Sequence, residues 1–203
     1  GRDSFANRID KAGIGNLAFD YTKLNQFADE VDDSSEDFSC IRDNVTGLVW
    51  EVKSPSSGTL PNTTLRDAQN SYYWDIGDTT TDADSTANTT CPNDTSCGLQ
   101  TYINEVNAID FCGGTNWRVP TYTELLGLID YGKQGQSVLI DLAFFPNMPE
   151  AGAIDNVNLP YWTSQTAADG TSLSQAYIID MSNGNDLAYP KENNAYVRLV
   201  RSR

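Results

Sequence analysis

The chain contains no histidine, and this absence removes several kinds of active site at once. Without an imidazole there is no Ser-His-Asp or Cys-His pair, no histidine ligand for zinc, and no ordinary general base near pH 7. Basic residues are also scarce, because 13 Lys and Arg stand against 28 Asp and Glu and leave a net charge of −15. Such a charge disfavours nucleic acids and anionic membranes as partners.

Long apolar runs are missing as well, since no stretch of eighteen apolar residues exists in the 203-residue chain. We therefore expect no insertion into a membrane. Hydrophobic residues make up 39% of the chain, including ten Tyr, seven Phe and four Trp. This is enough apolar material for the core of one domain with an elaborate periphery.

The four cysteines are Cys40, Cys91, Cys97 and Cys112. An even number of cysteines in an acidic chain rich in Asn and Thr indicates disulfides and an oxidising compartment. Of the three pairings, we favour Cys91–Cys97, which closes a short loop, together with Cys40–Cys112. The alternative is a zinc site with four thiolates, but only Cys91 and Cys97 lie close enough to resemble one of its two usual pairs. A catalytic cysteine is disfavoured because no histidine is present to activate it.

Composition divides the chain into two parts. Residues 1–38 are expected to form an acidic lead-in or linker, with an acidic run at 29–37 that has little to bury. The domain itself is expected over residues 39–203. Within it, residues 75–97 are almost wholly polar, and we interpret them as a long surface loop held by its cysteines.

Apolar spacing predicts the helices. A short helix is expected over Leu65–Tyr73, and a longer one from Leu99, with apolar residues at helical spacing as far as Ile109. Thr121 followed by Glu124 is the pattern of a capping box, which predicts the start of another helix after Pro120. The apolar residues that this helix would bury are Leu125, Leu128 and Ile129.

Strands are expected mainly in the last third of the chain. A β-type run over residues 47–53 places Trp50 and Val52 on one face, and further runs cover 161–164, 176–181 and 195–201. Ser182–Asn185 is a strong turn signal between the last two runs. Helices in the middle followed by antiparallel strands predict an α+β fold.

Five segments, in order and with plausible spacing over roughly residues 38–201, resemble the Lcl-type domain, the C-terminal domain of a collagen-like bacterial adhesin. The segments are Asp43–Glu51, Phe111–Gly114, Trp117–Leu126, Tyr161–Ser164 and Tyr196–Arg201. The element from Arg118 to Glu124 is also similar to a segment of formylglycine-generating enzymes. Both families belong to the C-type-lectin-like superfamily, so the resemblance implies two helices flanking a small twisted antiparallel sheet with long loops.

The resemblance further implies a secreted or surface-displayed binding module of bacterial origin. The best-known member recognises sulfated glycosaminoglycans. We do not extend that ligand to this chain, because binding sulfate groups requires clustered Lys and Arg and the chain has only 13 of them.

In this fold, ligand contact concentrates in loops between the last strands, which correspond to residues 165–175 and 182–194. Their amides, carboxylates and tyrosine suit a hydroxyl-rich glycan and also a protein surface. The candidate ligand-binding residues are Asp169, Asn183, Asn185, Asp186, Tyr189, Asn193 and Asn194.

Calcium is the one cofactor to consider. Asp78, Asp82 and Asp84 in the polar loop, with Asp75 nearby, offer carboxylate oxygens of the kind calcium prefers. The spacing does not match an EF-hand loop. We favour a solvated acidic loop over a calcium site.

Three functions follow as hypotheses. The leading one is an extracellular ligand-binding or adhesion module that contacts a glycan or a cell-surface protein through its C-terminal loops. The alternative is a structural or assembly subunit of a surface appendage, which would form a homo-oligomer. An enzyme is disfavoured, because formylglycine-generating relatives use cysteines late in the chain, whereas none follows Cys112, and no pair of acids stands out as a glycosidase site.

Overall fold

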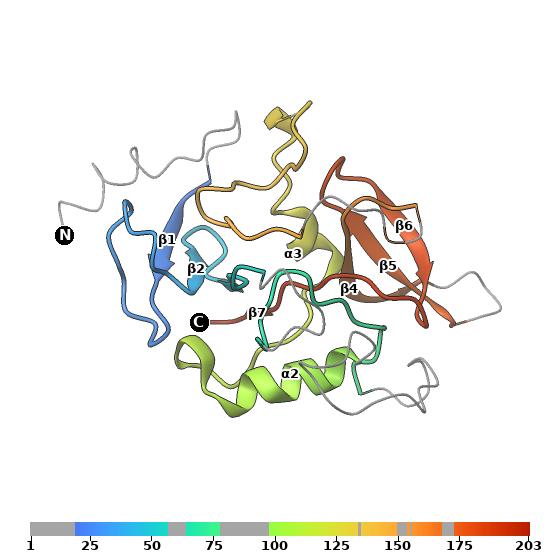
Figure 1. The fold of residues 1–203 in the computed structure, drawn as a ribbon, viewed down its shortest axis with the longest axis horizontal. Coiled ribbons are helices and arrows are strands. Elements are labelled where there is room, and N and C mark those ends of the chain that lie inside the picture. The colour runs from blue at the N-terminus through green and yellow to red at the C-terminus, as the bar shows by residue number, and fades with distance from the viewer. Residues whose placement is uncertain are drawn as a thin grey trace.

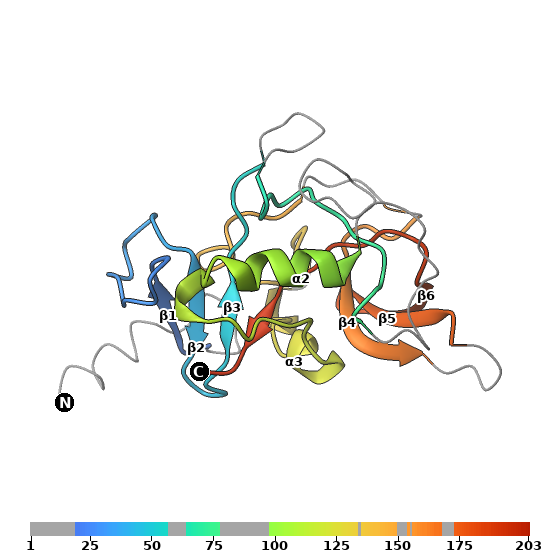
Figure 2. The same ribbon diagram turned by 90° about the horizontal axis from the view of Figure 1, so that it is seen from below.

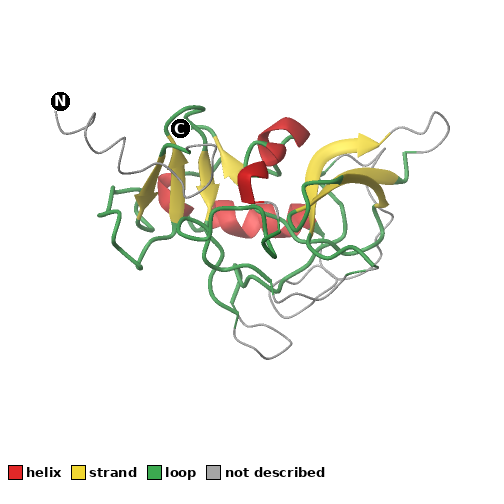
Figure 3. Ribbon diagram, turned by 90° about the horizontal axis from the view of Figure 1, so that it is seen from above, coloured by secondary structure: helices red, strands yellow, loops and turns green. Residues whose placement is uncertain are grey.

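The computed structural model describes residues 19–56, 64–77, 98–133, 135–149, 154, 156–167 and 173–203. These residues form a mixed α/β structure with two antiparallel sheets and two α-helices (Figures 1 and 2). The sheets lie at opposite ends of the molecule, and the helices lie between them (Figure 3). Mixed α and antiparallel β structure agrees with the predicted α+β class. No helix within the described ranges is long and apolar enough to cross a membrane.

The first sheet has the strand order β1-β2-β3-β7. Its strands are β1 (Tyr21–Leu24), β2 (Cys40–Asp43), β3 (Val49–Glu51) and β7 (Val200–Arg201). Strand β3 lies in the predicted run over residues 47–53, and Trp50 and Val52 are buried in the same cluster, as expected. The strand predicted over 195–201 is shorter in the structure, because Ala195 and Tyr196 form only isolated bridges.

Strand β1 lies inside the segment that the sequence predicted to be a linker. It pairs with β2 from Tyr21 opposite Asp43 to Leu24 opposite Cys40. Tyr21 is buried, and its ring centre lies 5.2 Å from that of Phe144. The folded unit therefore begins before residue 39. Four strand residues in a polar lead-in carry too weak a pattern to reveal this, whereas the acidic run at 29–37 does form a loop.

The second sheet consists of β4 (Pro160–Ala167), β5 (Gln175–Asp180) and β6 (Asp186–Pro190), in that order. Strands β4 and β5 fall on the predicted runs. Strand β6 lies in a stretch that the sequence predicted to be a ligand-binding loop, so that part of the prediction is wrong. Its short length, its proline and the Asn-rich turns on both sides concealed it, and as an edge strand it exposes its first two residues.

Helix α2 (Leu99–Ala108) confirms the helix predicted from apolar spacing, although Ile109 lies beyond its end and is 58% exposed. Helix α3 (Tyr122–Leu126) begins with the predicted capping box. The helix predicted over Leu65–Tyr73 is wrong. That segment forms turns instead, because its end pairs with the C-terminal part of the chain: the Tyr72 N–H donates to the Ala195 carbonyl at 2.9 Å.

A buried carboxylate joins the first sheet to α2 and to the C-terminal segment. The Lys53 ammonium donates to the Tyr102 hydroxyl at 2.8 Å, and that hydroxyl donates to Glu51. The other Glu51 oxygen accepts the Leu199 N–H at 3.0 Å, while Arg198 donates to the Glu51 carbonyl at 2.8 Å. Burial is the largest influence and raises the pKa of Glu51, but the charges of Lys53 and Arg66 and the hydrogen bonds from Leu199 and Tyr102 together outweigh it. The pKa of Glu51 therefore falls below its usual value.

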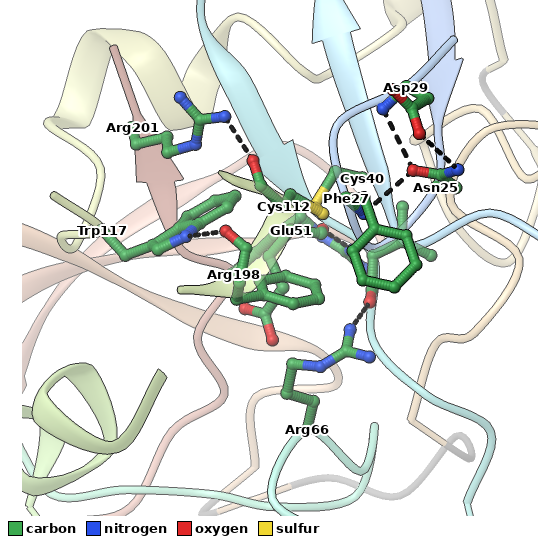
Figure 4. Close-up of a disulfide and its surroundings, with 12 residues drawn as sticks. Asn25, Phe27, Asp29, Cys40, Glu51, Arg66, Cys112, Trp117, Arg198 and Arg201 are labelled. Atoms are coloured by element: carbon green, nitrogen blue, oxygen red, sulfur yellow. Dashed lines mark hydrogen bonds between the residues drawn. A yellow bond between two sulfur atoms is a disulfide. The ribbon is translucent and has the colours of Figure 1, made fainter. Parts of the chain in front are cut away.

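The disulfide between Cys40 and Cys112 confirms the favoured pairing for these two cysteines (Figure 4). Both residues are completely buried, and Arg201 donates to the Cys112 carbonyl at 2.6 Å. The bond links β2 to the 3₁₀ turn Phe111–Gly113, which follows α2. Cys91 and Cys97 lie outside the described residues.

Replacing Cys40 and Cys112 together by alanine should lower the free energy of unfolding by about 4 kcal/mol. The bond closes a loop of 72 residues in sequence separation, so its loss releases the unfolded chain. Denaturation by guanidinium chloride of the variant and of the unaltered chain, both without reductant, would measure the difference. Equal midpoints and slopes would contradict this account of the disulfide.

Candidate functional site

The turn between β5 and β6 carries three of the predicted ligand-binding residues, which are Asn183, Asn185 and Asp186. All three are exposed. The buried Asp180 shapes the turn, because its carboxylate accepts the Ser182 N–H at 2.9 Å and the Asn183 side-chain amide at 2.9 Å. The structure therefore brings these three residues together on a rigid support.

The other predicted ligand-binding residues do not join them. Asn193 and Asn194 follow β6 and so lie at the opposite end of that strand, where both are half-buried. Tyr189 is 4% exposed and packs in the core, with its ring centre 5.6 Å from that of Trp162. Asp169 lies outside the described residues. The strand β6 separates what the sequence predicted to be one continuous loop.

A surface hollow of about 610 Å³ opens beside Asp186, between α3 and the second sheet. We call it the tyrosine groove. Its lining residues are Tyr122, Ser164, Gln165, Thr166, Tyr177 and Asp186. They come from α3 and from all three strands of the sheet, so only the tertiary fold assembles them.

The start of α3 places Tyr122 in the groove. Glu124 accepts the Thr121 N–H at 2.8 Å, and the Thr121 hydroxyl accepts the Glu124 N–H, which completes the capping box. Arg118 donates to both oxygens of Glu124, at 2.8 and 2.7 Å. The Tyr122 N–H donates to the Gln165 side-chain oxygen at 2.8 Å, which joins the helix start to β4.

A bulge in β4 directs the next part of the lining. Trp162 pairs with Ile178 and Thr166 with Ala176, so three residues of β4 lie opposite Tyr177 alone. The Ser164 N–H does not bond to the neighbouring strand and donates instead to the Pro120 carbonyl at 2.8 Å. Bulges commonly redirect side chains at binding sites. Here the bulge turns residues 164–166 toward the groove.

The polar and aromatic groups of the groove are coupled. The Tyr122 and Tyr177 rings pack edge to face, with centres 5.9 Å apart. Burial raises the pKa of Tyr122, and the charge of Asp186 and the hydrogen bond between them raise it further. Among the lining residues that the structure describes, Asp186 is the single carboxylate and none is a lysine or arginine. The groove therefore favours neutral or cationic ligands over anionic ones.

Ser164 also lines a second hollow, of about 450 Å³, between α2 and the segment that precedes α3. Its walls are mainly apolar, from Ile103, Trp117 and Val119, and Arg118 lies at its side. The shared serine makes the two hollows neighbours on one face. An apolar group of a ligand held in the tyrosine groove could extend into this second hollow.

Sequence reasoning named only Asp186 and missed the other five groove residues, of which Ser164 was assigned to a strand and Thr166 to a loop. Tyr122 was treated only as part of a helix start, Tyr177 as part of a strand, and Gln165 as the edge of a loop. One signal was available for Tyr177: it alternates in β5 with the buried Ala176 and Ile178, so it had to face the other side of the sheet. Nothing in the sequence indicated that α3 would cover that side.

The predicted calcium ligands Asp78, Asp82 and Asp84 lie outside the described residues. Asp75 is described, and its carboxylate accepts the Gly77 N–H at 3.2 Å. Elsewhere in the described ranges, no three Cys, Asp or Glu side chains converge in a way that could hold a metal ion.

A family model, the Lcl C-terminal domain, matches residues 39–201 of the chain. The match covers both sheets except β1, and it includes both helices and every residue of the tyrosine groove. No curated protein matches the chain.

Substituting Glu124 by Gln should lower the free energy of unfolding by about 1 kcal/mol at neutral pH, because glutamine can keep the capping box but loses the ion pair with Arg118. Hydrogen bonds from Arg118 hold the pKa of Glu124 at about 2, below its ordinary 4.5. Because the folded-state pKa is lowered, this stabilisation is complete above about pH 4.5 and is lost as pH falls toward 2. Urea denaturation between pH 2 and 7 would measure this. The free energy of unfolding of Glu124→Gln should fall less steeply with decreasing pH than that of the unaltered chain.

The matched control for this prediction is Glu36→Gln, since Glu36 lies in an exposed loop. The free energy of unfolding of Glu36→Gln should depend on pH in the same way as that of the unaltered chain. If that of Glu124→Gln did the same, the ion pair with Arg118 would not hold the start of α3.

Proposed function

Because the chain belongs to the family of Lcl C-terminal domains, we propose that it is an extracellular ligand-binding module that gives a bacterial surface protein its adhesive function. Lcl domains are associated with surface proteins of the adhesin type. The tyrosine groove is the binding site in this proposal. The observation that carries it is the convergence of Tyr122, Tyr177 and Asp186 in one open hollow on a rigid sheet.

We further propose that the fold is C-type-lectin-like. Two helices packed with short antiparallel strands and long connections support this assignment. So does the position of the groove on the late strands β4, β5 and β6, which is where ligand contact concentrates in that fold.

The chemistry of the lining favours a neutral, hydroxyl-rich glycan. Two tyrosine rings offer apolar faces and edges on which a sugar ring can pack. The Ser164 hydroxyl can donate to and accept from sugar hydroxyls, the Gln165 side-chain N–H group can donate, and Asp186 accepts. The Thr166 hydroxyl already accepts from the Lys191 ammonium at 3.1 Å. A sulfated glycan is disfavoured, because none of the described groove residues is basic and Asp186 would repel it.

Binding rather than catalysis is proposed for this groove. Hydrolysis of a glycoside normally needs two carboxyl groups that flank the scissile bond. The described part of the lining supplies Asp186 alone, and this carboxylate is already hydrogen-bonded to Tyr122. The chain has no histidine that could act as a base in its place.

Assembly is the second candidate function, and two exposed apolar side chains favour it. Phe27 is 71% exposed and Ile109 is 58% exposed. The Cys112 N–H donates to the Gln26 carbonyl at 3.1 Å, so the segment that carries Phe27 lies beside the 3₁₀ turn that follows Ile109 (Figure 4). A contact between subunits that covers this region would make the domain an oligomer.

Light scattering would measure the molar mass of the chain in solution. If the contact exists, the unaltered chain should have the mass of an oligomer and Phe27→Asp should have a lower mass.

An array of neutral and sulfated glycans should show saturable binding to neutral glycans only. With a neutral glycan from the array, Tyr177→Ala and Asp186→Asn should each weaken binding about tenfold, which corresponds to about 1.4 kcal/mol. Titration calorimetry would measure these affinities. The matched controls are Phe27→Ala and Asp37→Asn, which remove an exposed aromatic ring and an exposed carboxylate outside the groove.

Two results would contradict the proposal. One is a set of groove variants that bind as tightly as the unaltered chain. The other is binding that is confined to sulfated glycans and fades as the salt concentration rises.

A further inference from the structure

Two aspartates are buried in the segment after α3, away from the tyrosine groove. Asp130 is 0% exposed and Asp141 is 2% exposed. Asp130 precedes the 3₁₀ turn Tyr131–Lys133, and Asp141 begins the turn that leads to Phe144 and Phe145. The Asp130 N–H donates to the Leu139 carbonyl at 2.7 Å, which draws the two ends of this segment together.

Each carboxylate is only half satisfied. The Oδ1 of Asp130 accepts the Gly132 N–H at 2.8 Å, and the Oδ1 of Asp141 accepts the Ala143 N–H at 3.1 Å. The Oδ2 atoms of both residues are buried and have no hydrogen-bond partner. A buried carboxylate oxygen without a partner is costly, so two in one segment require an explanation.

The nearby ammonium groups do not supply the missing partners. Lys133 lies 3.6 Å from the Oδ1 of Asp141 and also donates to the Ile140 carbonyl at 3.1 Å. Lys23 is close enough for the charge of Asp141 to act on it, but its ammonium donates to the carbonyls of Asp33 and Ser35, at 2.8 and 2.9 Å. Both ammonium groups thus donate to backbone carbonyls, and neither donates a hydrogen bond to the Oδ2 atom of Asp130 or Asp141.

The Tyr21 phenol on β1 experiences both carboxylates. Burial raises its pKa first, and the negative charges of Asp43, Asp141 and Asp130 raise it further. The side chain of Tyr21 is wedged against Phe144 and Phe145, with ring centres 5.2 and 5.8 Å away. The phenol of Tyr21 therefore lies in the same buried region as the two aspartates, between β1 and the segment that carries them.

We propose that Asp130 and Asp141 hold a hard metal cation of the calcium type through their Oδ2 atoms, next to Tyr21. Carboxylate oxygens are the ligands that such ions prefer, and calcium accepts irregular sets completed by carbonyl oxygens and water. A cation satisfies both bare oxygens and offsets their charge together, whereas a water molecule offsets no charge.

The site supplies two carboxylates, not three, which is consistent with the absence of any threefold cluster in the described ranges. So small a ligand set predicts binding in the millimolar range, as in weak extracellular calcium modules. The cation would lie beside β1, which precedes the matched family region, without taking a ligand from it. This inference does not depend on the ligand of the tyrosine groove.

The first test is the thermal unfolding of the full chain after chelator treatment, with Ca²⁺, Mg²⁺ or Na⁺ added at constant ionic strength. At ten times the dissociation constant, Ca²⁺ should raise the unfolding midpoint by about 3–6 °C. Asp130→Asn and Asp141→Asn should each abolish that rise. Asp37→Asn should keep it, and so should Asp82→Asn, which tests the separate acidic loop.

The second test uses Tb³⁺, which emits when a nearby tyrosine absorbs light and transfers the energy. Tyr21→Phe should lower the Tb³⁺ emission by more than half while the midpoint rise with Ca²⁺ persists. The two Asn variants should lose both signals, and circular dichroism before heating establishes that they are folded. The proposal is overturned if no cation shifts the midpoint, or if Asp130→Asn and Asp141→Asn respond to Ca²⁺ like the unaltered chain.

Discussion

The buried carboxylate of Glu51 is the interaction on which the centre of the molecule depends, because it joins three segments that are far apart in the sequence. Its oxygens accept from Tyr102 on α2 and from the backbone of Leu199 next to β7, and Lys53 neutralises its charge. A buried charge with its partner removed is strongly destabilising. The network therefore fixes α2 and the C-terminal segment on the first sheet, and the disulfide of Cys40 and Cys112 lies beside this junction (Figure 4).

That fixed centre explains how the second sheet can present an open face. One side of β5 packs Ala176 and Ile178 into the core that surrounds α2, so the other side must carry Tyr177 outward. Helix α3 then covers part of that side, and its first residue, Tyr122, meets Tyr177. The groove is thus a consequence of a sheet that is longer than the helix that covers it, and the bulge in β4 adds polar side chains at its edge.

Electrostatics divides the acidic residues into groups with different roles. Most of the 28 acids contribute to a net charge of −15 that repels anionic ligands. Glu51 and Glu124 are paired with cations and hold elements in place. Asp186 is exposed in the groove, where it selects against anionic groups. Asp130 and Asp141 are buried and each keeps one oxygen without a hydrogen-bond partner, although Lys133 lies 3.6 Å from the other oxygen of Asp141.

The sequence by itself determined the elements whose signals are local. The capping box of Thr121 and Glu124, the apolar spacing of α2 and the alternation in β3 each depend on a few neighbouring residues, and all were predicted correctly. Tertiary contacts decided the rest. Tyr72 pairs with Ala195, so Leu65–Tyr73 is not a helix, and β1 and β6 exist because a neighbouring strand supplies their hydrogen bonds. The groove depends on α3 meeting three strands, and Tyr21 from β1 packs against the segment that follows Asp141. Such proximity follows from packing between distant segments and leaves no local pattern.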